Sequence, residues 1–79
     1  MRPATFAVRG DHVTLGQLLK LVGVIDAGGG ARAFLAEGGV RVNGEPEARR
    51  GRKLRPGDLV SVPGMVLVRL VAEHGTPGR

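Results

Sequence analysis

The segment V-R-V-N-G at residues 40–44 constrains the fold of this chain more than any other. Val40 and Val42 point one way and Arg41 the other, which is the alternation of a strand with one buried face. Asn-Gly is the pair most typical of a two-residue hairpin turn, because both residues tolerate a positive φ. The sequence therefore predicts a strand that runs directly into a tight turn.

Two helical stripes precede this strand. Thr14 and Gln17 have the spacing of a capping box, with the threonine at the helix start and the glutamine three residues later. The apolar residues that follow recur at i, i+3, i+4 and i+7, and they are Leu15, Leu18, Leu19 and Val22. A shorter stripe consists of Ala31, Phe34 and Leu35. Glycines at 23 and at 38–39 are natural helix ends.

Further strands are expected at residues 5–8, 59–62 and 65–71, separated by turns at 55–58 and 63–64. This order predicts an α+β domain in which two short N-terminal helices pack on a small antiparallel sheet. We expect a single small domain over residues 1–72, with its core motif at about 14–62, and a disordered tail at 73–79.

The charge of the chain is concentrated in one place. The 79 residues carry 12 basic and 7 acidic side chains, for a net charge of +5. The run from Arg49 to Arg55 holds five of the basic ones and is too highly charged for a core, so we interpret it as a basic loop that grips a polyanion. Glu45 and Glu47 come just before it and could partly screen it.

Several kinds of function are excluded or disfavoured by what the chain lacks. With two Phe and no Trp or Tyr, there are too few aromatic rings for a platform that stacks single-stranded bases. There is no Cys, and two isolated His do not make a metal site. No nucleophile elbow or P-loop is present, so we expect no enzyme, no cofactor and no small-molecule substrate. No apolar run suits a membrane span or a signal peptide, and a cytoplasmic protein without a membrane partner is expected.

Two motifs resemble the S4 RNA-binding domain family, also called the αL RNA-binding motif. G-G-V-R-V-N-G at residues 38–44 matches the family pattern G-x-V-x-V-N-G at every fixed position. K-L-R-P-G-D at residues 53–58 matches the basic K-L-x-x-G-D that precedes an apolar strand. The resemblance covers roughly residues 15–62, and L-L-K at 18–20 is similar to small stand-alone bacterial members of the YbcJ and YaaA type. Many larger members carry Ser-Arg where this chain has Ala27 and Gly28, so that arginine's contact is not carried over, and Arg32 is a candidate substitute.

The resemblance implies binding to structured RNA, such as ribosomal or transfer RNA, in ribosome- or translation-related work. Free N–H groups at the helix starts would attract phosphate. The candidate RNA-binding side chains are Lys20, Arg32, Arg41, Arg49, Arg50, Arg52 and Lys53. Candidates for a backbone contact or a turn are Gly29, Gly30, Asn43 and Gly44.

Two other interpretations remain open at this level. The same basic face could meet an acidic protein, which would make the chain an adaptor. Double-stranded DNA is a weaker alternative, because no clear recognition helix is present.

Overall fold

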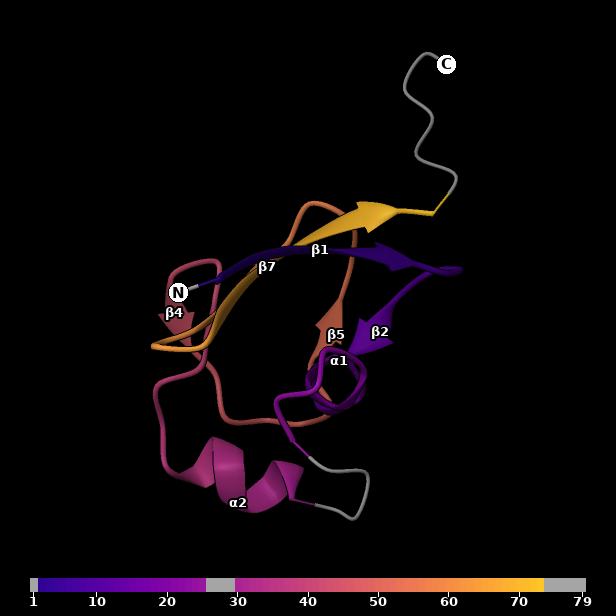
Figure 1. The fold of residues 1–79 in the computed structure, drawn as a ribbon. Helices are drawn as coiled ribbons and strands as arrows, with labels where there is room; N and C mark the ends of the chain where they lie inside the picture. The colour runs from indigo at the N-terminus through magenta and orange to yellow at the C-terminus, as the bar shows by residue number, and fades with distance from the viewer. Residues whose placement is uncertain (1, 26–29, 74–79) are drawn as a thin grey trace.

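The computed structural model describes residues 2–25 and 30–73 of the chain. Strands occupy more of this part than helices do (Figure 1). In chain order the elements are β1 (Arg2–Val8), β2 (Val13–Thr14), α1 (Leu15–Leu21), α2 (Ala31–Ala36), β3 (Arg41–Val42), β4 (Glu45–Pro46), β5 (Lys53–Leu54), β6 (Leu59–Val62) and β7 (Val66–Ala72).

The main sheet has five strands in the order β1-β7-β6-β3-β4. Its two longest strands, β1 and β7, come from opposite ends of the sequence and pair in parallel, with Arg2 opposite Val66 and Val8 opposite Ala72. The other neighbours pair antiparallel, including β3 with β6, as expected. The predicted fold, two N-terminal helices on a small antiparallel sheet, is therefore wrong. The protein consists mainly of a mixed sheet, and its first strand precedes both helices. Turn signals indicate only how consecutive elements are connected, so they could not reveal that β1 pairs with β7.

A second, two-stranded sheet joins β2 to β5, with Val13 opposite Leu54 and Thr14 opposite Lys53. This pairing corrects the interpretation of the basic segment as a loop, because the C-terminal part of the segment is a strand. Leu54 is completely buried, whereas Lys53 beside it is exposed. One apolar side chain within the basic run thus fixes that run to the body of the protein.

A single hydrophobic core lies between the main sheet and the two helices, which are on the same side of β1 and β7 (Figure 1). Leu15, Leu18, Leu19 and Leu35 are buried there, as the helical stripes predicted. Val22 and Phe34 are only partly buried and pack at its edge. On β7 every second residue from Val66 to Leu70 faces this core, so the intervening Arg69 faces outwards.

Two local predictions are confirmed in detail. The Thr14 hydroxyl accepts a hydrogen bond from the Gln17 amide at 3.3 Å, and the Gln17 Oε1 accepts one from the Thr14 amide at 3.0 Å. This is the reciprocal capping box at the start of α1. Asn43 and Gly44 have φ values of 54° and 85° and connect β3 to β4. Both values are positive, as a type I′ hairpin turn requires.

Candidate nucleic-acid interface

The basic segment is anchored by its backbone to the start of α1. The Leu15 amide donates to the Arg52 carbonyl at 2.9 Å, and the Gly16 amide donates to the Arg50 carbonyl at 2.8 Å. Within the segment, the Arg52 amide donates to the Arg49 carbonyl at 3.1 Å and closes a turn. Residues 49–52, the basic turn, are therefore folded against the helix, and their side chains project from a fixed backbone.

These bonds leave the start of α1 without a free amide. The Leu15 and Gly16 amides donate to the basic turn, while the Thr14 and Gln17 amides are used in the capping box. The expectation that phosphate binds free N–H groups is therefore wrong for α1. Attraction of an anion here must come from side chains.

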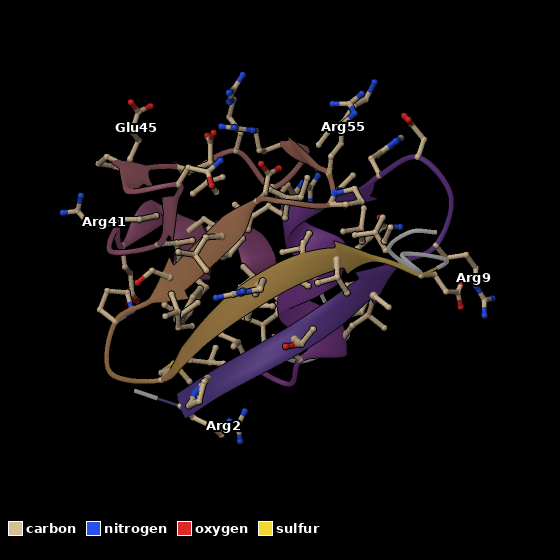
Figure 2. All side chains as sticks on the ribbon, turned by 90° about the horizontal axis from the view of Figure 1, so that it is seen from above. Arg2, Arg9, Arg41, Glu45 and Arg55 are labelled. Carbon is tan, nitrogen blue, oxygen red and sulfur yellow. The ribbon has the colours of Figure 1, made fainter. Side chains whose placement is uncertain are left out.

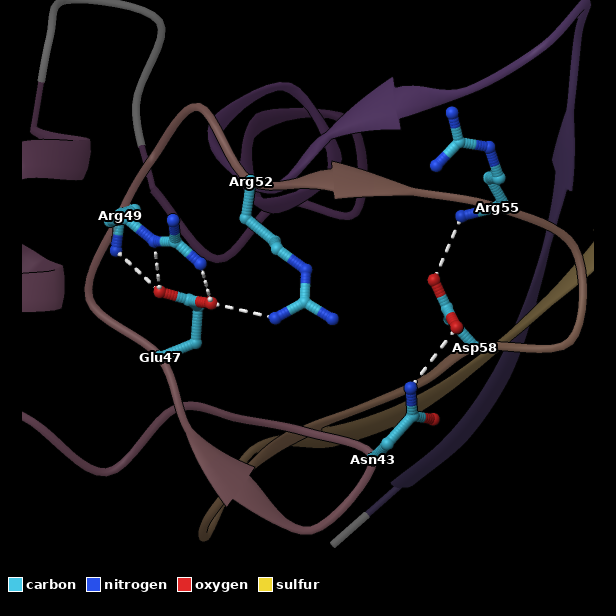
Figure 3. Close-up of polar contacts among 6 residues, drawn as sticks. All are labelled: Asn43, Glu47, Arg49, Arg52, Arg55 and Asp58. Carbon is cyan, nitrogen blue, oxygen red and sulfur yellow. Dashed lines mark hydrogen bonds and ion pairs between the residues drawn. The ribbon is translucent and has the colours of Figure 1, made fainter.

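Glu47 holds two of the predicted RNA-binding arginines (Figure 3). Its carboxylate accepts hydrogen bonds from Arg49 Nε at 3.1 Å and Nη2 at 3.2 Å, and from the Arg49 amide at 3.1 Å. Arg52 Nη1 donates to it at 2.8 Å from the other side. The Glu47 side chain is only 8% exposed, against 76% for Arg49 and 34% for Arg52. The carboxylate therefore neutralises part of the charge of the basic turn and fixes both guanidinium groups.

The pKa of Glu47 is lowered from 4.5 to about 2. The largest cause is the side-chain hydrogen bonding from Arg49, and the second is the hydrogen bond from Arg52. A lowered pKa in the folded state means that the ionised carboxylate stabilises the fold above pH 4.5, and that this contribution is lost as the pH falls towards 2. We therefore expect Glu47→Gln to lose less stability than the wild type over that interval, as measured by urea denaturation at a series of pH values. The matched control is Glu45→Gln, which removes a carboxylate that makes none of these bonds. Equal pH dependence for the wild type and Glu47→Gln would contradict the assignment.

Lys20 and Arg50 face a common pocket between α1 and the basic turn. The pocket has a volume of about 260 Å³. Both side chains belong to exposed residues, and no carboxylate of the described residues pairs with either. Lys53, which is exposed on the adjoining β5, is likewise unpaired within the described part of the chain. Among the described residues, no carboxylate neutralises these three cations, whereas Glu47 pairs with Arg49 and Arg52.

The other predicted residues are less closely grouped. Arg41 lies on the β3–β4 hairpin near Glu45 (Figure 2), and its Nη1 donates to the Gly44 carbonyl at 3.3 Å. Gly30 is exposed and precedes α2, where its carbonyl accepts from the Phe34 amide at 2.9 Å. Gly29 and the side chain of Arg32 lie outside the described part of the structure. Of the predicted RNA-binding side chains, the structure thus brings Lys20 and Arg50 together at one pocket. The role of Arg32 stays a prediction.

Asn43 has a structural task that connects the two sequence motifs (Figure 3). Its Nδ2 donates to Asp58 Oδ1 at 3.0 Å, and its Oδ1 accepts from the Leu59 amide at 3.0 Å. The second Asp58 oxygen accepts from the Arg55 amide at 2.8 Å. The side chain of Asn43 therefore ties the hairpin turn to the start of β6 and links the V-N-G and G-D segments in space.

The sequence did not reveal the remaining walls of the pocket. Gly16, Ile25 and Gly51 line it together with the capping pair Thr14 and Gln17. The capping box was the available signal, because it located the start of α1. Nothing in the sequence indicated that the basic turn would fold back on that start.

Within the described residues, no group of three or more His, Asp or Glu side chains is placed to hold a metal ion. The described helices include none with the length and apolar character needed to cross a bilayer.

Comparison with known sequences agrees with the two S4 motifs. Residues 6–69 match the S4 domain family. Because the match covers most of the chain, the protein belongs to the S4 domain family.

Two relatives show where the chain stands in this family. It is 58% identical over 54 residues to the "Probable ribosome maturation protein RlbA" of Bacillus subtilis, an overlap of 68% of this chain and 76% of the relative. It is 42% identical over 62 residues to the "Putative RNA-binding protein YbcJ" of Escherichia coli, covering 77% of this chain and 89% of the relative. No solved structure matches it significantly.

Proposed function

We propose that this chain is a non-catalytic RNA-binding module that docks a basic face on structured RNA in ribosome-related work. The observation that carries the proposal is a group of cations on a fixed backbone that no described carboxylate pairs with. Lys20 and Arg50 line one pocket, and Lys53 lies opposite Thr14 of the same pocket. Lysine and arginine that neutralise phosphates release counterions, and this supplies much of the affinity of such complexes. The names of the two relatives support an RNA partner and a role near the ribosome. Ribosomal or transfer RNA is the finer proposal.

Structured RNA is favoured over an unstructured strand for two reasons. The cations project from a backbone that α1 and β2 hold in place, so their spacing suits a partner of fixed shape. Two Phe in the whole chain offer little surface on which successive bases could stack.

Fluorescence anisotropy at one fixed salt concentration tests the proposal. We expect a hairpin RNA to bind more tightly than an unstructured homopolymer of equal length, because only the hairpin presents phosphates at fixed spacing. Poly-glutamate serves as the acidic-protein control. Preference for the homopolymer would contradict the choice of structured RNA. Binding to poly-glutamate with none to RNA would replace the proposal by the adaptor interpretation.

A further inference from the structure

We propose that the pocket between α1 and the basic turn receives a single unpaired nucleotide of the bound RNA. This inference rests on the proposed RNA-binding function and goes beyond it, because it assigns a recess for one flipped-out base rather than a surface for backbone phosphates alone.

The shape of the pocket supports this occupant. Its volume of about 260 Å³ lies just below the usual range for small-molecule sites, so it suits a ligand part no larger than a nucleotide. Glycines at positions 16 and 51 stand on its two sides, one on α1 and one on the basic turn. Glycine has only a hydrogen atom in place of a side chain, so neither residue fills the pocket with side-chain atoms. A patch that only contacted backbone phosphates would not need such a recess.

The chemistry of the lining matches the parts of a nucleotide. Ile25 gives an apolar wall for one face of a base and is itself packed against the core. Arg50 carries a planar guanidinium, a group on which unpaired RNA bases commonly stack when aromatic rings are absent. Lys20 supplies a point charge suited to the phosphate of the same nucleotide.

Gln17 adds a polar group at a fixed place. Its Oε1 accepts from the Thr14 amide, and this bond holds the side chain at the pocket. The Nε2 end of the same amide carries two donors, which suit the acceptors on the edge of a base. A flipped-out base would thus find an apolar wall, a stacking plane and hydrogen-bond donors in one recess.

Three hairpin RNAs of matched length test this inference with the intact chain. One has a fully paired stem, one has a single unpaired nucleotide in the stem, and one has an abasic residue at that bulge. We expect the bulged hairpin to bind on the order of tenfold more tightly than the paired one, as is typical for one buried, stacked base. The abasic hairpin should bind like the paired one, because it lacks the group that enters the pocket.

Gly51→Val tests the location of the effect. Gly51 does not have a positive φ, and a Cβ there would meet no atom within 4 Å, so valine should occupy the pocket without straining the backbone or changing the charge. We expect this variant to lose the preference for the bulge, so that it binds the bulged and the paired hairpin equally. Thr5→Val, which adds an exposed valine on β1, should keep that preference.

The outcomes separate the two proposals. If the paired and bulged hairpins bind the wild type equally, the nucleotide pocket is wrong and RNA binding stands. If none of the hairpins binds, the proposed function is wrong and the pocket with it. The wild-type comparison is decisive by itself, so the test does not depend on the stability of the Gly51→Val variant.

Discussion

Leu54→Ala is expected to destabilise the domain by about 2–5 kcal/mol, the usual cost of truncating a fully buried leucine. Leu54 lies within the basic run, yet its side chain is completely buried, and its strand is paired with β2. Truncation would open a cavity under that pairing and loosen the basic turn from α1. The total stability of a small domain is commonly about 5–15 kcal/mol, so this loss would be a large part of it.

Urea denaturation measures the effect through the midpoint of unfolding. Leu21→Ala is the matched control, because Leu21 is a leucine of α1 that is 64% exposed, and its truncation should change stability by no more than about 0.5 kcal/mol. Similar losses for the two variants would mean that the β2–β5 pairing does not contribute to the core as described.

Replacing Lys20 and Arg50 together with Ala is expected to weaken RNA binding on the order of 10- to 100-fold at about 0.1 M salt. Each phosphate contact contributes roughly 0.7–0.9 to the slope of log affinity against log salt. With a fully paired hairpin, which offers no base to the pocket and leaves both cations to contact phosphate, the double variant should therefore flatten that slope by about one to two units. Stability should change little, because both residues are exposed and neither side chain is in an ion pair within the described residues.

Two controls show whether position matters as well as charge. Arg69→Ala removes an exposed cation from the outward face of β7 and should leave binding nearly unchanged. Arg49→Ala removes a cation already paired with Glu47 and should have an effect smaller than that of Arg50→Ala. The assignment fails if the Lys20 and Arg50 double variant binds RNA with unchanged affinity and unchanged salt slope.

The family and the local elements were predictable because their causes are local in sequence. The capping box depends on two residues three positions apart, and the hairpin turn depends on Asn43 and Gly44. The apolar faces of α1 and β7 likewise follow from regular spacing. The basic run was visible as composition, and the two S4 motifs were visible as fixed patterns.

Only the tertiary structure decided the rest. The parallel pairing joins β1 to β7, the first and last strands of the described residues, and turn signals between consecutive elements do not encode such a contact. The same holds for β2 with β5, which places Leu54 in the core although its neighbours in sequence are charged. It also holds for the backbone hydrogen bonds between the basic turn and α1. These bonds hold the two walls of the pocket together and occupy the amides at the start of the helix. Residue type sets what a side chain can do, but its surroundings can depend on distant segments. Arg50 faces the pocket because the basic turn folds against α1, whereas Arg49 pairs with Glu47 only two residues away.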